Sequence, residues 1–353
     1  MALTILNVAY PLAPVGPDAV GGAEQVLSEL DRALAQAGHR SIVVACEGSQ
    51  VAGTLLAVPR ARSDLSAHTE LAQGRHRRAV AAALDRWSID VVHLHGVDFH
   101  AYLPSAGVPA LATLHLPVNW YAPAALRPER PQTWLNCVSW AQHAACPVTE
   151  RLLAPIENGI AVDIFSRGHA KRGFALMLAR ICPEKGVHLA IEAAKLAGVS
   201  LLIAGEIFRY GEHQRYFESE VEPRLDRWRR FIGPIGLARK RRLLAAARCL
   251  VVPSLVPETS SLAAREALAA GTPVVAFARG ALVETLEHGR TGFLVNDVHE
   301  MAHAMRRAGR LDPAHCRAAA RSRFPLRLMI GRYFELYERL AQDAEQHEAA
   351  GTA

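Results

Sequence analysis

The stretch at residues 257–271, PETSSLAAREALAAG, constrains the fold most, because an apolar run stands on each side of it. The runs at 249–253 and 272–276 predict buried strands, so we expect a strand, a loop, a helix and a second strand. The residues at 262–270 are strong helix formers, and Gly271 ends the helix. This order of elements is typical of α/β proteins.

The start of the predicted helix is suited to an anion. Ser260 or Ser261 stands at the N-cap position, and the first turn has no acidic residue to occupy its free N–H groups. Glu258 precedes the helix and Glu266 lies about one and a half turns inside it, so one carboxylate can face a sugar and the other a ribose. An ordinary buried helix with two solvated glutamates is the alternative that this segment alone leaves open.

Strands and helices alternate along the chain, with one break near a polar, basic linker. The pattern predicts an α/β protein with two Rossmann-like, doubly wound domains facing a cleft. We expect an N-terminal domain at 1–165, a C-terminal domain at 166–325, and a last helix at 326–345 that packs back on the first domain. The chain has 353 residues, half of them hydrophobic, which is enough for two cores.

Two strand-to-helix turns carry further candidates. Gly21 and Gly22 precede a helix and would let the backbone approach a ligand closely, although a plain tight turn explains them as well. Arg180 and Lys185 bracket a second turn and predict a clamp for a diphosphate, with a pair of surface cations as the alternative.

Three histidines at the ends of predicted strands, His93, His95 and His115, raise the question of a metal. They are spread over separate strands, and no cysteine or carboxylate stands at ligand spacing, so we expect no metal site. Alternation along the strand points His93 inward. For His95 and His115, polar residues that close a strand end and residues of a functional site remain equally compatible.

Charge and cysteine content narrow the class of protein. The net charge of +6 and the pI of about 9.2 favour an anionic ligand, such as a nucleotide, an acidic lipid surface or nucleic acid. The six cysteines form no C-x-x-C pair, so we expect no disulfide framework and a reducing cytoplasm. No signal peptide or membrane-spanning run is recognisable, which predicts a soluble, cytoplasmic protein. The arginines and lysine at 227–242 would be a solvated face or a contact with the inner face of a membrane.

Taken together, these segments resemble the retaining glycosyltransferases of family 4, which have the two-domain B-type glycosyltransferase (GT-B) fold. The matching motifs cover nearly the whole chain, and their shared order and spacing are more specific than any one of them. They are GGAE at 21–24, DVVHLH at 90–95, TLH at 113–115, ENGI at 157–160, LARICPEKG at 178–186, PSLVPETSSLAAREALAAGTPVVA at 253–276, RGALVE at 279–284 and GRTGFLV at 289–295.

The resemblance implies a hexosyltransferase that moves a sugar from a nucleoside-diphosphate sugar to an acceptor hydroxyl, with retention and without a metal or other cofactor. The implied catalytic residues are Glu258, His115, Arg180 and Lys185. The implied donor-binding residues are Gly21, Gly22, Glu206, Ser260, Ser261, Leu262 and Glu266, and the implied acceptor-side residues are Glu24, His95 and Ser139.

In this scheme Arg180 and Lys185 neutralise the charge that grows on the departing diphosphate. Glu258 binds the transferred sugar, His115 contacts it near the reacting carbon, and Glu266 binds the ribose hydroxyls. The donor phosphate takes the proton of the acceptor, so no dedicated protein base is expected. The acceptor would be a glycan, a lipid-linked glycan or a small metabolite, and no nucleic acid is expected as a partner.

The chain departs from the family pattern at several points. Thr259, Ser260 and Ser261 replace a common Pro-Phe-Gly, Ala179 replaces a glycine before Arg180, and Ala281 replaces a second glycine. No charged role is lost, but the nucleotide base and the sugar stay open. A nucleotide-sugar epimerase of the same fold is one alternative. A non-catalytic binder of nucleotide-sugars or nucleic acid is the other, although few aromatic residues stand among the cations.

Overall fold

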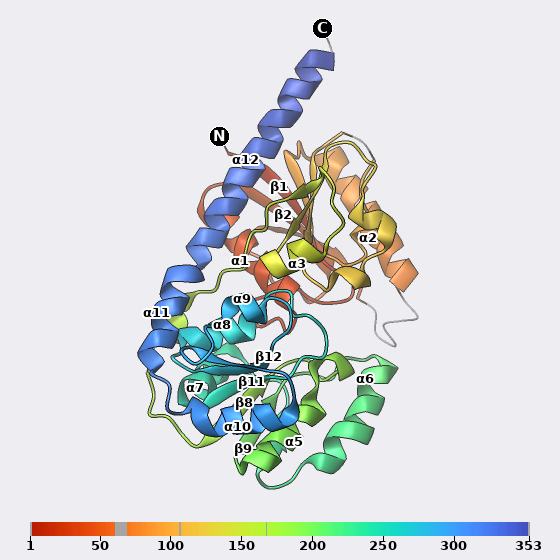
Figure 1. Cartoon of the computed structure of the whole chain (residues 1–353). Helices are drawn as coiled ribbons and strands as arrows, with labels where there is room; N and C mark the ends of the chain where they lie inside the picture. The colour runs from red at the N-terminus through yellow and green to blue at the C-terminus, as the bar shows by residue number, and fades with distance from the viewer. Residues whose placement is uncertain (1, 61–68, 106, 167, 352–353) are drawn as a thin grey trace. The chain divides into compact units, whose positions relative to one another are not determined.

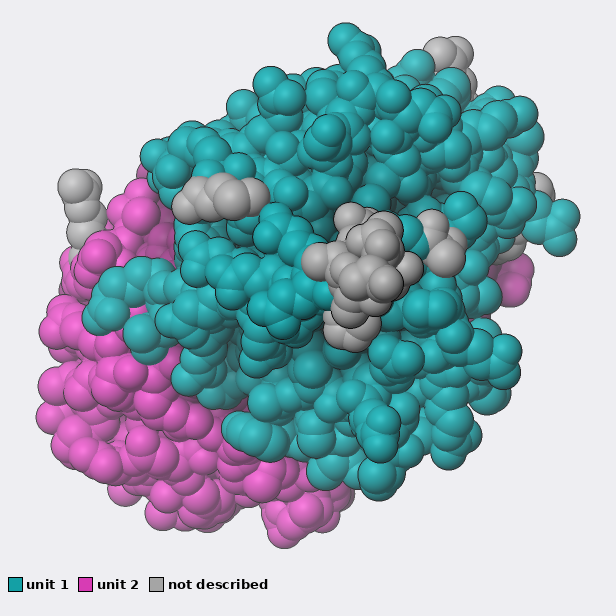
Figure 2. All heavy atoms as spheres, turned by 90° about the horizontal axis from the view of Figure 1, so that it is seen from above, with its two compact units in different colours: residues 1–157, 327–353 teal, residues 158–326 magenta. Residues whose placement is uncertain are grey.

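The structure, a computed structural model, describes residues 2–60, 69–105, 107–166 and 168–351. The chain divides into two compact units, residues 1–157 with 327–353 and residues 158–326, which Figure 2 shows in two colours. The division lies earlier than the expected one at residue 166, because Ile160 already exchanges backbone hydrogen bonds with Phe324 and Leu326 at the end of the second unit.

Unit 1 is built on a parallel sheet, of which Figure 1 labels β1 and β2. The strand order is β3-β2-β1-β4-β5-β6-β7. Its strands are β1 (Thr4–Val8), β2 (Arg40–Cys46), β3 (Thr54–Val58), β4 (Val91–Leu94), β5 (Ala110–Leu114), β6 (Thr133–Cys137) and β7 (Leu152–Leu153). Its helices are α1 (Gly22–Gln36), α2 (Thr69–Arg86), α3 (Trp140–Ala145) and most of α12 (Leu326–Gly351). Short 3-10 turns at Phe99–Ala101, Val118–Trp120 and Pro123–Leu126 connect them.

The two faces of the unit 1 sheet differ in polarity. One face is apolar, because alternate residues such as Leu6 and Val44 pack with Val80 of α2. The other face carries buried polar side chains. Among them His93 bonds Tyr337 of α12 through Nδ1, at 2.7 Å, and Thr113 through Nε2, at 2.7 Å. The C-terminal helix is therefore joined to the sheet of unit 1 by specific polar contacts.

Unit 2 repeats the same topology. Its parallel sheet has the order β10-β9-β8-β11-β12-β13. The strands are β8 (Phe174–Leu178), β9 (Ser200–Ala204), β10 (Arg229–Phe231), β11 (Cys249–Val252), β12 (Val274–Phe277) and β13 (Gly292–Val295). The helices are α4 (Val162–Phe165), α5 (Val187–Ala197), α6 (Gly211–Tyr216), α7 (Leu237–Ala246), α8 (Leu262–Ala269), α9 (Leu282–Thr285), α10 (Val298–Ala308) and α11 (Pro313–Arg323).

Alternation along the strands of unit 2 produces a core on each face of its sheet. Met177 faces the layer that contains α5 and α10, whereas its neighbour Leu176 faces the layer that contains α7, α8 and α11. Both sheets thus have helices on both faces, and every strand pairing among the described residues is parallel. The predicted class, α/β with two Rossmann-like doubly wound sheets, is confirmed.

Some predicted element bounds differ from the observed ones. The sequence pattern at 64–87 predicts a long helix. The structure has this helix at Thr69–Arg86, and the first residues of the predicted range lie outside the described part of the chain. The last helix continues to Gly351, beyond the expected end at 345. Propensity and pattern identify a helix better than its ends, which depend on capping and packing.

Candidate functional site

The strand order places the candidate site of unit 2. In a sheet of this order, the connections from the two central strands leave in opposite directions, and ligands bind beside the carboxyl ends of those strands. The central pair here is β8 and β11, which lie next to one another. The loop after β8 carries Arg180 and Lys185, and the loop after β11 carries Glu258. The topology therefore brings these three predicted residues to one edge.

Lys185 and Glu258 form the central contact of this edge. Lys185 Nζ lies 2.6 Å from Glu258 Oε1, and the exposed fractions of the side chains are 22 % and 9 %. The Ser254 hydroxyl donates a hydrogen bond to the same oxygen. The lysine is thus fixed on one side while part of its side chain stays accessible to a ligand.

The electrostatics of Glu258 follow from these neighbours. Burial alone would raise its pKa, but Lys185, the Ser254 hydroxyl and Arg180 together hold the pKa of Glu258 below its ordinary value. Glu258 is therefore a carboxylate at neutral pH. A carboxylate accepts several hydrogen bonds and donates none, which suits a pair of sugar hydroxyls.

Two glycines with positive φ allow the loops of this edge to approach one another. At Gly186 (φ 61°) an added Cβ would lie 2.3 Å from the Pro253 carbonyl oxygen. At Gly280 (φ 59°) it would lie 2.3 Å from the Glu258 carbonyl oxygen. The Ala281 N–H donates to that same Glu258 carbonyl at 2.7 Å. The backbone of Glu258 is thus fixed by the RGALVE segment, which explains why a glycine stands there.

The start of α8 differs from the expected N-cap. Ser261 is the N-cap residue, but it has a left-handed backbone (φ 56°, ψ 73°) and its side chain makes no capping hydrogen bond. Ser260 is 3 % exposed, and its hydroxyl has no hydrogen-bond partner among the described residues. The first N–H groups of an α-helix lack partners within the helix, and no acidic residue stands in this first turn. These free backbone N–H groups can donate hydrogen bonds to a bound anion.

Glu266 occupies the second turn of α8 and faces a cation that the sequence did not single out. Lys240 Nζ of α7 lies 2.6 Å from Glu266 Oε1, and the side chains are 19 % and 8 % exposed. Burial raises the pKa of Glu266, and Lys240 offsets this only in part. Glu266 has fewer charged and hydrogen-bonding partners than Glu258, so its ionised form is stabilised less.

Arg180 and Glu206 complete the predicted set in unit 2. The Arg180 guanidinium lies over the Phe208 ring, 5.6 Å from its centroid. This cation–π contact holds one face of the guanidinium in place. The Glu206 carbonyl accepts a hydrogen bond from the Ile181 N–H at 3.0 Å and so joins the loops after β9 and β8. The predicted role of the Glu206 side chain near a nucleotide stays a prediction.

In unit 1 the glycine turn lies at the N-terminus of α1. Gly21 is the N-cap residue, and Gly22 is the first residue of the helix. A Cβ at Gly21 would lie 1.8 Å from Glu24 Oε2, so the Glu24 carboxylate folds back over the helix start. Glu24 is buried. A side chain at Gly21 would displace the Glu24 carboxylate, which can move because it is the end of a flexible side chain.

The predicted histidines of unit 1 lie together after β4 and β5. His95 Nδ1 lies 3.0 Å from His115 Nε2, and the rings are stacked. Burial lowers the pKa of His115 to about 3, and burial with the neighbouring His93 and His115 lowers the pKa of His95 well below its ordinary value. Both rings are neutral at neutral pH. Both nitrogens of His93 are already engaged by Tyr337 and Thr113, so the three rings do not form a free ligand set.

Ser139 is fully buried and caps α3, since its hydroxyl accepts a hydrogen bond from the Gln142 N–H at 3.1 Å. Gln142 in turn donates to the Leu114 and Leu116 carbonyls, at 2.8 Å each, beside His115. This contact positions the loop that carries His115. A direct role of Ser139 toward an acceptor stays a prediction.

Sequence reasoning missed Lys240 and Ser254. Lys240 lies within the basic stretch at 227–242, but this stretch is not a uniform cationic face. Lys240 pairs with Glu266, and the Arg229 guanidinium is ion-paired with Asp226. Ser254 lies four residues before Glu258, in the same loop. The closeness of Ser254 to Glu258 along the chain is the signal that could have identified it.

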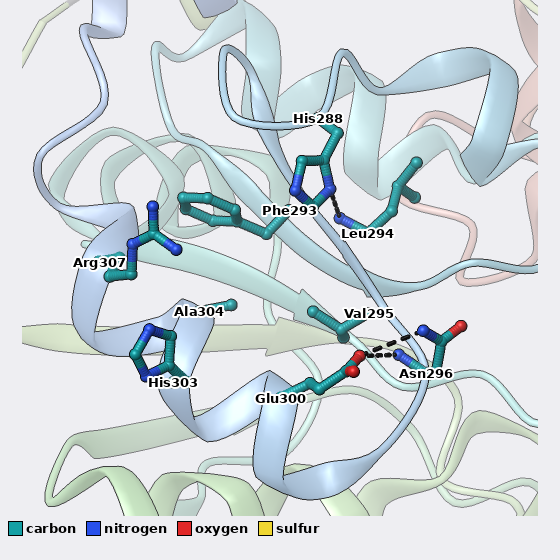
Figure 3. Close-up of a pocket in the computed structure, with 9 residues that line it drawn as sticks. All are labelled: His288, Phe293, Leu294, Val295, Asn296, Glu300, His303, Ala304 and Arg307. Carbon is teal, nitrogen blue, oxygen red and sulfur yellow. Dashed lines mark hydrogen bonds between the residues drawn. The ribbon is translucent and has the colours of Figure 1, made fainter.

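A separate surface pocket of about 350 Å³ lies between β13 and α10 (Figure 3). His288, Phe293 and Arg307 are among its lining residues. Its lining contains none of the predicted site residues, and it lies against the β13 side of the sheet, away from the central strands. We assign it no part in the candidate site.

Comparisons with known proteins agree with the geometry. Residues 20–154 match the family model described as Glycosyltransferase Family 4, and residues 173–309 match the model described as Glycosyl transferases group 1. A glycogen synthase of Mycobacterium tuberculosis is 29 % identical over 381 aligned residues, which cover 91 % of this chain and 89 % of that protein.

Solved structures show the same fold across nearly the whole chain. A sucrose-phosphate synthase from Thermosynechococcus elongatus has a TM-score of 0.79 at 20 % identity and covers 96 % of this chain and 99 % of its own. HepE of Anabaena, in complex with UDP-glucose, has a TM-score of 0.75 at 19 % identity and covers 96 % of this chain and all of its own, 100 %. Both similarities support the two-domain GT-B fold. Within the described residues, no helix combines the length and the apolar composition needed to cross a bilayer.

Proposed function

We propose that this chain, which belongs to glycosyltransferase family 4, moves a hexosyl group from a nucleoside-diphosphate sugar to an acceptor hydroxyl with retention and without a metal. The observation that carries the proposal is the Lys185–Glu258 contact of 2.6 Å beside the central strands of unit 2. It places a cation for a phosphate next to a carboxylate for a sugar. A nucleoside-diphosphate sugar contains both groups, joined directly to one another.

The leaving group would be stabilised by two cations. As the glycosidic bond breaks, negative charge grows on the diphosphate, and preorganised positive groups lower the free energy of that transition state. Arg180 offers a planar guanidinium that can donate two parallel hydrogen bonds, and Lys185 offers a compact ammonium charge. Both cations lower the pKa of Glu258. With these two cations and the open N–H groups of α8, the proposed transfer needs no metal.

Glu258 and Glu266 would bind different parts of the sugar donor. Glu258 is fixed by its backbone contacts with residues 280 and 281 and stays charged, so it suits the hydroxyls of the transferred sugar. Glu266 lies in the second turn of α8, beyond the phosphate-binding N–H groups, and suits the ribose hydroxyls. Ser260, whose hydroxyl lacks a partner among the described residues, would donate to a phosphate oxygen.

The histidines of unit 1 fit a neutral role. With a pKa of about 3, His115 is a weak base at neutral pH and would act through hydrogen bonding to the sugar. This supports the scheme in which the donor phosphate, and no protein group, takes the acceptor's proton. Gly21 and Gly22 would contact the donor through their backbone, and Glu24, His95 and Ser139 would lie on the acceptor side.

UDP-glucose is the first donor to test, because a structurally similar protein, HepE, holds it. The full-length protein would be heated with a panel of nucleoside diphosphates and their sugars, without added metal. A ligand that binds only the folded state raises the midpoint, so a selective shift would name the base. No shift with any nucleotide would overturn the donor site.

Transfer itself would then be measured as release of the nucleoside diphosphate with glucans, lipid-linked glycans and small hydroxyl compounds as acceptors. Retention predicts an α-linked product from an α-linked donor, visible in the anomeric proton coupling by NMR. Glu287→Gln, an exposed glutamate paired with Arg290 in the same unit, is the matched control for Glu258→Gln. An inverted product would contradict retention, and an epimerised sugar nucleotide formed without acceptor would contradict transfer.

A further inference from the structure

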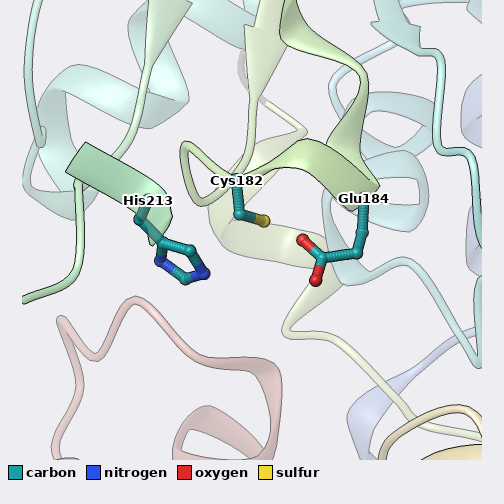
Figure 4. Close-up of side chains that lie close together, drawn as sticks. All are labelled: Cys182, Glu184 and His213. Carbon is teal, nitrogen blue, oxygen red and sulfur yellow. The ribbon is translucent and has the colours of Figure 1, made fainter. Parts of the chain in front are cut away.

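Three side chains of unit 2 that the transfer scheme does not use converge beside the donor-site loop. Cys182 and Glu184 stand in the loop after β8, and His213 lies in α6, which follows β9. Their Sγ, carboxylate oxygen and imidazole nitrogen atoms all lie within 4.8 Å of one another. Figure 4 shows the three side chains directed into the same space.

The polar atoms of this cluster are short of partners. His213 is 8 % exposed, and its Nδ1 has no hydrogen-bond partner among the described residues. Glu184 Oε2 is likewise buried without a partner there. The Cys182 thiol makes a long contact of 3.8 Å to the Arg180 carbonyl and a hydrogen bond with the Glu184 carboxylate, a second member of the cluster. Burying such atoms without partners is unfavourable, so the cluster is incomplete as it stands.

We propose that Cys182, Glu184 and His213 bind one Zn²⁺ ion, with a fourth position left to water. Thiolate, imidazole and carboxylate are the ligands that zinc takes in proteins, at about 2.0–2.3 Å from the ion. A tetrahedral site with those bonds has ligand atoms about 3.3–3.7 Å apart, so the three side chains need to close by about 1.5 Å at most. A thiolate and an imidazole disfavour magnesium and calcium, which prefer oxygen ligands.

The ion would join two loops that position the donor cations. The Glu184 carbonyl accepts from the Leu255 N–H at 2.8 Å, which joins the loop of Lys185 to the loop of Glu258. His213 belongs to the segment that carries Phe208, on which Arg180 rests. Zinc therefore has a positioning role and takes no part in the transfer step. The site does not depend on the proposed function, because it is formed by residues outside the donor contacts.

Cobalt provides a direct test, because Co²⁺ bound by a thiolate shows a charge-transfer absorption that a site without sulfur lacks. The full-length protein would be stripped with a chelator and titrated with Co²⁺, then with Zn²⁺ against a coloured competing chelator. We expect one Co²⁺ per chain, a thiolate band, and loss of that band when Zn²⁺ is added. No sugar nucleotide is present, so the result is separate from any test of transfer.

Cys182→Ser is expected to remove the thiolate band, and His213→Ala to weaken Zn²⁺ binding by more than the about 10- to 100-fold typical of losing a supporting group. Cys316→Ser, the same change at another buried cysteine of unit 2, is the control and should leave binding unchanged. Glu184→Gln gives a milder variant if Cys182→Ser fails to fold. Sub-stoichiometric Co²⁺, or a band that survives in Cys182→Ser or is lost in Cys316→Ser, would overturn the site.

Discussion

Glu258 and Glu266 are both more than nine-tenths buried and each lies 2.6 Å from a lysine, yet their pKa values shift in opposite directions. Burial raises both. In Glu258 the contributions of Lys185, Ser254 and Arg180 outweigh burial, whereas in Glu266 the contribution of Lys240 does not. The number of charged and hydrogen-bonding partners, and not the burial, decides the state of each carboxylate.

Replacing Glu258 with glutamine is expected to separate transfer from nucleotide binding. The variant removes the sugar-binding carboxylate and frees Lys185, so kcat should fall about 100- to 1,000-fold, in the range seen when one preorganised polar group is lost from an active site. The affinity for the nucleoside diphosphate should stay the same or rise. Steady-state kinetics and calorimetry give the two numbers. Equal losses in both would assign Glu258 to the nucleotide, and Glu287→Gln is the control.

Lys240→Met is expected to destabilise the protein by about 1–3 kcal/mol, because it leaves Glu266 buried and uncompensated. The raised pKa of Glu266 contributes stability below its unfolded pKa, and this is lost as pH rises through the folded value. The penalty of Lys240→Met should therefore shrink as the pH falls and Glu266 takes a proton.

Urea unfolding of Lys240→Met at neutral and at acidic pH would measure this penalty. The double variant Lys240→Met/Glu266→Gln is the matched control, since it removes the charge together with its partner and should recover most of the lost stability. A double variant less stable than the single one would show that Lys240 acts by packing alone.

The sequence was sufficient to predict the fold, because its signals are local. Apolar runs such as 249–253 and helix formers such as 262–270 lie within a few residues of one another, and alternation of the two implies parallel sheets. Arg180, Lys185 and Glu258 are predictable because each stands at a turn between a predicted strand and a predicted helix. Because the carboxyl ends of parallel strands lie at the same edge of a sheet, the topology alone brings these loops together.

The missed residues lie on elements whose orientation the sequence does not fix. Lys240 and Glu266 are separated by 26 positions on two helices, and their contact depends on the rotation of α7 against α8. The same holds for His213, which joins Cys182 and Glu184 only through the path of the segment after β9. Ligand spacing along the chain could not reveal that cluster, and the zinc site proposed there departs from the expectation that the chain binds no metal.

Tyr337 is expected to matter more than Tyr333 for holding α12 on the sheet of unit 1. The Tyr337 hydroxyl lies 2.7 Å from His93 Nδ1, whereas the Tyr333 hydroxyl makes longer contacts of 3.2 and 3.4 Å with Thr113 and Asn136. Tyr337→Phe leaves a buried nitrogen without its partner, which costs about 1–3 kcal/mol. Chemical unfolding of the two Tyr→Phe variants compares them, and an equal or larger loss in Tyr333→Phe would contradict this order.

Acid is expected to destabilise unit 1 before unit 2. Burial lowers the pKa of His76 to about 4 and of His115 to about 3, and it also lowers the pKa values of His93 and His95. A histidine with a lowered folded pKa contributes stability that is present above its unfolded pKa of about 6.5 and is lost as pH falls toward the folded value. Each one costs about 1.4 kcal/mol per pH unit in that window.

Hydrogen exchange followed by mass spectrometry, at pH 7 and pH 5, would locate this loss of stability after correction for the intrinsic exchange rate. Protection should fall in β1, β4 and β5 and persist in β8, β11 and β12. His76→Gln should reduce the pH dependence of this protection. A loss of protection that begins in unit 2 would contradict the assignment.

Gly280 and Gly289 offer a matched pair for the backbone of the donor site. Both have positive φ, 59° and 78°, but a Cβ at Gly280 would lie 2.3 Å from the Glu258 carbonyl oxygen and 2.7 Å from its nitrogen, whereas a Cβ at Gly289 meets nothing within 4 Å. Both alanine variants bear the cost of a left-handed backbone, about 1–2 kcal/mol.

Only Gly280→Ala must also move Glu258, since the backbone cannot give way as a side chain does. We therefore expect a larger loss of thermal stability for Gly280→Ala than for Gly289→Ala. A fall in kcat of at least about tenfold is expected for Gly280→Ala alone, because a displacement of about an ångström at a catalytic group costs that much or more. Equal kcat values in the two variants would show that the RGALVE segment does not position Glu258.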